Sequence, residues 1–209
     1  MQSYRADTYD TGRLYMAGFT VISDVSEALV KLFKENMVPD VIQSPDGVGL
    51  CSPAEKGDYA LGIYLYDVKE SEEVFSNGMQ MSGLNKQKFP PHFLDLFFMI
   101  TPYSMSDLKF RMSEEQRIMG RVLQIMADTP VLDSSLLGPG VAGDTYPMRI
   151  ELLRLSNEEK MKLWTFPNEP YKTSLYYRVA PVEIESTKVR DVSRVRKLDV
   201  EFSEVTSEV

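Results

Sequence analysis

Two stretches of the chain repeat apolar residues at the spacing of an α-helix. Over residues 25–37 the apolar side chains recur every three or four positions, and Pro39 follows. Residues 113–128 show the same spacing and precede Pro130. Each stretch opens with a residue pair typical of a capping box: Asp24 with Glu27, and Ser113 with Gln116. The pattern therefore predicts two main helices.

Other segments carry the patterns of β-strands. Residues 59–66 are apolar or amphipathic on both faces, which is typical of an interior strand, so we expect this strand at the centre of a sheet. Residues 93–103 form an aromatic-rich apolar run, and residues 174–185 predict a long strand that Pro181 places at an exposed edge. The remaining elements are short: strands over 48–51 and 149–155, and a helix that Ser156 and Glu159 open and Pro167 ends.

This order of elements predicts an α/β fold of the mixed α+β kind. We expect one mixed β-sheet of about five to six strands flanked by the two main helices. A length of 209 residues is near the upper end of an ordinary single domain. The chain therefore divides into an N-terminal arm over residues 1–18, one domain over 19–185 and a C-terminal extension over 186–209.

The connection over residues 69–92 shows no period that would build an element. A connection of this length is uncommon inside a compact domain and is often functional. Its apolar side chains stand among polar neighbours, as in a contact surface that orders on assembly. These side chains are Phe75, Met79, Met81, Leu84 and Phe89. We expect them to face a neighbouring subunit or another component of an assembly.

The C-terminal extension alternates apolar and charged residues. Leu198, Val200 and Phe202 would lie on one face of a strand. One interpretation is an added strand that pairs with an open sheet edge of another subunit. The other interpretation is a disordered tail.

Composition narrows the class of protein. The chain is 43% hydrophobic and 26% charged, which is typical of a globular protein. Its net charge of -8 would repel a phosphate backbone, so we expect no nucleic-acid partner. Cys51 has no second cysteine to pair with, which favours folding in a reducing cytoplasm. The longest apolar run is too short for a bilayer, which needs roughly 20 residues, and the first residues do not form a signal peptide.

The sequence contains little evidence for a catalytic, metal or cofactor site. His92 is the only histidine, so a triad has one possible base and a zinc site lacks ligands. Gly138, Gly140 and Gly143 match the spacing of a dinucleotide fingerprint, but Pro139 removes a backbone donor and residues 144–147 lead towards a strand where the motif needs a helix. No pair of carboxylates stands out from the others. We therefore expect no catalytic, cofactor-binding or metal site, and a protein that is not an enzyme.

A set of segments in a fixed order adds a resemblance to this interpretation. They are Val25–Leu29, Leu61–Val68, Pro90–Pro91, Gly120–Leu132, and Leu163–Trp164 followed by Tyr171–Val182. Together they resemble the cap, or tail-terminator, family of extracellular contractile injection systems, which are phage-tail-like particles with a tube inside a contractile sheath. The resemblance is to the N-terminal domain of that family and runs from about Phe19 to Ile184.

The resemblance implies a structural assembly protein with a tail-terminator-like fold. Such a cap forms a six-fold ring of identical subunits on the last layer of inner tube protein and sheath protein, stops growth and couples the two. It would be assembled in the cytoplasm and then become part of the particle. The alternatives are another ring-forming component of the baseplate or tube, a small ligand-binding module, and a small hydrolase built around His92.

Overall fold

The computed structural model describes residues 18–74, 78–81, 85–132, 135–137 and 146–192. Phe75, Leu84, Leu198, Val200 and Phe202 lie outside the described residues, as does the segment from Gly138 to Gly143. The helices are α1 Val21–Met37, α2 Leu108–Asp128 and α3 Asn157–Leu163. The strands are β1 Val48–Leu50, β2 Leu61–Glu70, β3 Gln80–Met81, β4 Lys86–Lys88, β5 His92–Pro102, β6 Arg149–Leu152, β7 Leu175–Ile184 and β8 Val189–Asp191.

The main sheet has five strands in the order β1-β2-β5-β7-β6. β1 and β2 are parallel, and the other neighbours are antiparallel. The prediction of one mixed sheet flanked by two main helices is therefore confirmed. The strand predicted at residues 59–66 is interior, as β2 between β1 and β5, but the central strand of the sheet is β5. A second sheet, β3-β4-β8, adds three short strands that the sequence analysis did not foresee.

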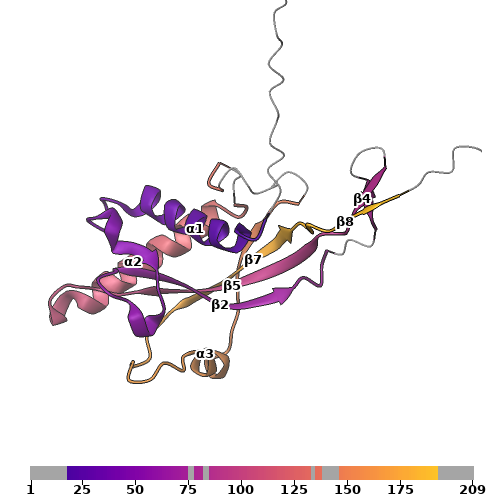
Figure 1. Cartoon of the computed structure of the whole chain (residues 1–209). Coiled ribbons are helices and arrows are strands. Elements are labelled where there is room, and N and C mark those ends of the chain that lie inside the picture. Colours follow the sequence, from indigo (N-terminus) through magenta and orange to yellow (C-terminus); the bar gives the residue numbers. More distant parts are fainter. Residues whose placement is uncertain (1–17, 75–77, 82–84, 133–134, 138–145, 193–209) are drawn as a thin grey trace, which may run out of the picture.

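Helices cover both faces of the main sheet (Figure 1). α1 and α2 pack on one face, where Phe33, Leu96, Phe98 and Val122 are fully buried in the main core. α3 and the segment after it lie on the other face, where Trp164 packs with sheet residues in a smaller cluster. Ring pairs in this cluster meet edge to face, a favourable geometry for aromatic side chains. They are Tyr64 with Phe166, Tyr66 with Tyr176, and Trp164 with Phe166.

Both main helices begin earlier than predicted. α1 starts at Val21, which is buried against the sheet, and the predicted cap residue Asp24 lies inside the helix and accepts a 2.9 Å hydrogen bond from Oγ1 of Thr20. α2 starts at Leu108, and Oγ of the predicted cap Ser113 donates to the carbonyl of Phe110. The first turns of α2 are exposed, so they lack the apolar period that marked its buried half. The capping box of α3, Ser156 with Glu159, is confirmed.

The prediction of an edge position for the strand with Pro181 is wrong, because β7 lies between β5 and β6. The pairing of β6 with β7 ends at Arg149 and Ala180, so Pro181 lies just beyond its last partner on that side. On the other side, the register between β5 and β7 shifts between Leu94 and Leu96. Pro181 therefore stands where neither ladder needs its missing N–H.

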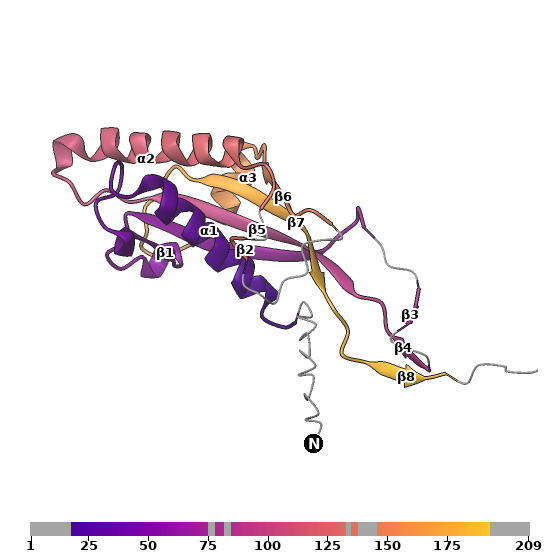
Figure 2. The same cartoon turned by 90° about the horizontal axis from the view of Figure 1, so that it is seen from above.

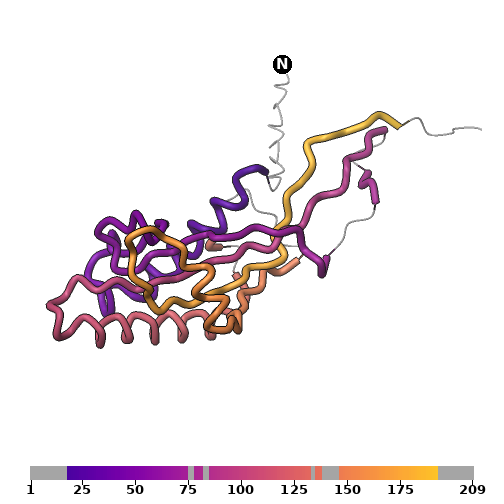
Figure 3. The backbone as a smooth tube through the Cα atoms, turned by 90° about the horizontal axis from the view of Figure 1, so that it is seen from below, coloured from indigo at the N-terminus to yellow at the C-terminus, as the bar shows by residue number. Residues whose placement is uncertain are grey.

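The prediction that the connection over residues 69–92 contains no helix or strand is wrong. β2 continues to Glu70, and β3 and β4 lie within the segment. β4 pairs antiparallel with β8, so a part of the C-terminal extension runs beside this connection. Figure 3 shows both segments leaving the main sheet at the same end. We call β3, β4 and β8 together the arm.

Candidate assembly surfaces

Of the groups considered for chemistry, His92 and Cys51 belong to the described part of the chain. Nδ1 of His92 is 3.7 Å from Oε1 of Glu70, and both side chains are more than two-thirds exposed, so the pair is a surface contact. Burial raises the pKa of the Cys51 thiol more than Lys56 lowers it, which disfavours the reactive thiolate. Within the described ranges, no three side chains cluster as metal ligands, and no helix is long and apolar enough to cross a membrane.

The N-terminal end of α2 exposes a group of apolar side chains. Leu108 is 79% exposed, Met105 and Met112 are each 65% exposed, and Phe110 is 54% exposed. The buried residues of the helix begin only at Ile118. We call these four exposed residues the α2 tip. Large apolar side chains that cluster at the surface mark a contact site in many proteins.

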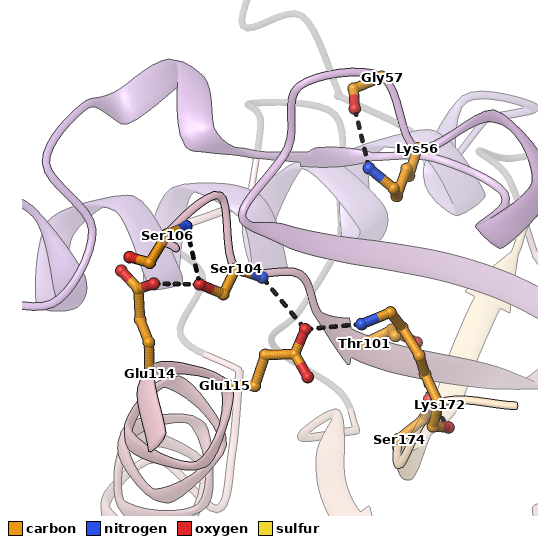
Figure 4. A network of polar contacts seen from close by, with 9 residues as sticks. All are labelled: Lys56, Gly57, Thr101, Ser104, Ser106, Glu114, Glu115, Lys172 and Ser174. Carbon is orange, nitrogen blue, oxygen red and sulfur yellow. Dashed lines mark hydrogen bonds and ion pairs between the residues drawn. The ribbon is translucent and has the colours of Figure 1, made fainter. Parts of the chain in front are cut away.

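A polar network fixes the α2 tip to the end of β5 (Figure 4). Oγ of Ser104 donates to Glu114 and also accepts from the backbone N–H of Ser106 at 3.1 Å. Oε1 of Glu115 accepts from the N–H of Ser104 at 3.3 Å and from Nζ of Lys172 at 2.6 Å. The hydrogen bonds from Ser104 and Ser106 lower the pKa of Glu114. The apolar tip is therefore presented on an anchored helix end.

The arm stands at the other end of the molecule, because β5 runs from His92 beside the arm to Pro102 beside the α2 tip (Figure 2). Backbone bonds hold its segments together: Phe89 N–H donates to the carbonyl of Lys188 at 3.0 Å, and Val192 N–H to that of Asn85 at 2.9 Å. Lys88 forms an ion pair with Glu185, and both side chains are largely buried. Hydrogen bonds and an ion pair thus stabilise the arm as a folded part of the structure.

The predicted contact residues of this segment divide into two groups. Met81 on β3 is 47% exposed, whereas Met79 and Phe89 are partly buried. Nζ of Lys188 lies 5.3 Å from the centre of the Phe89 ring, so one contact of this ring lies within the arm. Phe75 and Leu84 belong to the part of the segment that is not described. Met81 is thus the member that the structure places most openly at the surface.

An ion cluster crosses the main sheet beside the shift in register between β5 and β7. Arg178 on β7 contacts Asp95 on β5, Glu73 after β2 and Glu151 on β6, with N–O distances of 2.7, 2.7 and 3.0 Å. Burial would lower the pKa of Arg178, but its hydrogen bonds to Glu73 and Asp95 outweigh burial and raise it. This cluster was not predicted from the sequence. Its signal was a charged residue in the middle of each of two largely apolar strands, Asp95 in β5 and Arg178 in β7.

A family model named Pvc16 N-terminal domain matches residues 24–197 of the chain. The chain belongs to this family. The match covers the main sheet, the arm, α2, α3 and all but the first three residues of α1. It supports the resemblance from which we expected a cap of a contractile injection system.

Two solved structures share the fold of this Pvc16 N-terminal domain. One is the sheath/tube terminator of an extracellular contractile injection system, PVC, in its extended state, with a TM-score of 0.65, 14% identity and coverage of 90% of this chain. The other is the tube-terminating cap of the anti-feeding prophage, with a TM-score of 0.56, 16% identity and 86% coverage. This chain spans 65% and 61% of those two chains. No curated protein matches the sequence.

Proposed function

We propose that this Pvc16 N-terminal domain protein caps the distal end of the tube and sheath of a contractile injection particle. In this role it stops the growth of both structures and couples the sheath to the tube. The observation that carries the proposal is the terminator fold shared over 90% of the chain at a TM-score of 0.65. Membership of the family supports the same role.

The cap acts as a ring of identical subunits, six-fold like the layers that it closes. The α2 tip and the arm support this arrangement, because they are different surfaces at opposite ends of β5. A contact between unlike surfaces joins subunits head to tail, and it generates a ring when the rotation closes. The domain over residues 19–185 forms the body of the ring, with residues 1–18 and 186–209 extending from it.

The remaining contacts follow from the apolar residues outside the core. Met79, Met81 and Phe89, with Phe75 and Leu84, face the tube protein or the next subunit. Leu198, Val200 and Phe202 pair as a strand with an open sheet edge on a sheath subunit or a neighbouring cap. The role is structural rather than enzymatic and needs no cofactor. The protein is assembled in the cytoplasm and leaves the cell as a part of the particle.

The test is deletion of the gene in the cell that produces the particles, followed by measurement of particle lengths by electron microscopy. We expect overlong or uncapped tubes, or sheaths that detach, and recovery when the intact gene is supplied. Particles of normal length and normal sheath attachment in the deletion strain would contradict the proposal.

A further inference from the structure

The sheet has an open edge at β1. Among the described strands, β1 pairs with β2 alone. The N–H of Cys51 donates to the carbonyl of Ile63 on β2 at 3.1 Å, so Gly49 and Cys51 direct their backbone groups toward β2. Because these groups alternate along a strand, the N–H and C=O of Leu50 point away from β2. They are available to another strand.

A groove runs along this edge, between β1 and α1. Its volume is about 510 Å³, and Val30 of α1 lines it together with Val48, Leu50 and Tyr59. Leu50 is 43% exposed there. An edge strand beside a helix is the setting in which extended peptides add to a sheet, with backbone bonds to the strand and pockets for alternate side chains.

The charged side chains that line the groove are three acids, Glu27, Glu35 and Asp46, and two lysines, Lys31 and Lys34, so the rim is acidic by one charge. Nζ of Lys31 lies 3.9 Å from Glu35 and donates to the carbonyl of Ser135. This small excess of negative charge favours a segment with one basic residue followed by alternating apolar ones.

The C-terminal extension of this chain has that sequence. Arg196, Leu198, Val200 and Phe202 occur at every second position, as strand residues that share a face would. Leu198 and Val200 match the apolar floor of the groove, and Arg196 matches its acidic rim. We propose that residues 196–202 of one copy add as a strand to β1 in the groove of a second copy.

The fold disfavours the same contact within one chain. Leu50 is aligned across the sheet with Ile63, Ile100 and Leu175. From Leu175 the chain runs through β7 to β8, which ends at Asp191 and lies at the end of the molecule away from β1 (Figure 2). Leu198 lies only seven residues beyond Asp191 and can reach back at most about 25 Å. The groove that it can occupy belongs to another subunit.

This inference rests on the proposed cap function and specifies it. Donor and acceptor lie at opposite ends of the molecule, β8 at one and β1 at the other (Figure 2). Each subunit would give its extension to one neighbour and receive that of the other, which is the head-to-tail contact that a ring requires.

The test uses disulfide formation in assembled particles. The full chain carries Leu50→Cys and Val200→Cys in a Cys51→Ser background, and purified particles are oxidised and analysed by non-reducing gel electrophoresis. We expect a shift of the chain from monomer to a ladder of linked multimers. The matched control replaces Leu50→Cys by Met161→Cys, since Met161 is 58% exposed on α3, and should stay monomeric.

Each outcome decides between the proposals. A disulfide closed within one chain would overturn the role of a second copy. Chain that is present in particles of normal length but forms no ladder, or forms as much in the control, would overturn the inference and leave the cap function standing. Absence of the unmodified chain from purified particles would overturn both.

Discussion

Arg178 on β7 and Asp95 on β5 form a buried ion pair, with Nε donating to Oδ2 at 2.8 Å. Asp95 lies at the irregularity where the register between the two strands shifts. Beyond this point β5 and β7 still pair with each other, and the chain then continues to β4 and β8 of the arm. The pair therefore joins β5 to β7 where regular pairing is interrupted, and Glu73 and Glu151 extend the contact to the neighbouring segments.

Replacing Arg178→Met should strongly destabilise the protein, because it leaves the buried carboxylate of Asp95 without its cation. We expect the free energy of unfolding to fall by about 3–5 kcal/mol in urea denaturation. The control is Arg178→Met combined with Asp95→Leu, which removes both charges and should recover most of the loss. A single variant that loses less than about 1 kcal/mol would show that the pair does not hold the strands together.

Two glycines should respond in opposite directions to alanine. A Cβ on Gly62 would lie 2.6 Å from Sγ of Cys51 and 2.9 Å from the Tyr103 ring, so Gly62→Ala should cost about 1–3 kcal/mol by overpacking. A Cβ on Gly120, inside α2, meets nothing within 4 Å. Gly120→Ala should therefore stabilise the protein by about 0.5–1 kcal/mol. Thermal unfolding of the two variants measures both changes in stability. A Gly62→Ala variant as stable as the unmodified protein would contradict the close packing around Gly62.

Glu183 should make stability depend on pH. Burial, with a smaller contribution from Glu185, raises the pKa of Glu183 above its ordinary value of 4.5, although Lys88 opposes this. A carboxyl group with a raised pKa binds more protons in the folded state, so its deprotonation lowers stability as pH rises through that range. Glu183→Gln should raise the free energy of unfolding at neutral pH and change it little at a pH well below 4.5.

The control for this prediction is Glu72→Gln, because Glu72 is exposed. It should leave the pH dependence of unfolding unchanged. Glu183→Gln curves that run parallel to those of the unmodified protein at all pH values would contradict the raised pKa.

The α2 tip should be required for assembly but not for folding. Leu108→Asp with Phe110→Asp exchanges two exposed apolar side chains for acids at the beginning of a helix, where negative charge is favourable. The free energy of unfolding should stay within about 0.5 kcal/mol, whereas incorporation into particles should be lost. Met161→Asp, an exposed position on α3, is the control and should be incorporated normally. Normal incorporation of the tip variant would exclude the tip as a contact.

Local signals in the sequence were sufficient for several elements. The capping box of Ser156 and Glu159 placed the start of α3, and helical spacing ended α1 at Met37 and α2 at Asp128. These features depend on residues within one or two turns of each other, so the sequence carries them directly. The order of segments also indicated the family, because that order is itself a property of the sequence.

Local sequence patterns did not indicate the arm or the pairing of its strands. β3, β4 and β8 have only two or three residues each, too few for a period, and β8 finds β4 across about a hundred intervening positions. The beginning of α2 was not predicted for a related reason. Its apolar residues are exposed and do not follow the helical spacing of a buried face.

By itself, the sequence determined the long helices and strands, the mixed α+β class and the family, because each depends on local spacing or on the order of segments. Only the tertiary structure decided the neighbours: β1 parallel to β2, Arg178 beside Asp95, and the groove between α1 and β1. Such pairings join residues far apart in the chain, and the burial that selects them exists only once the sheet has formed.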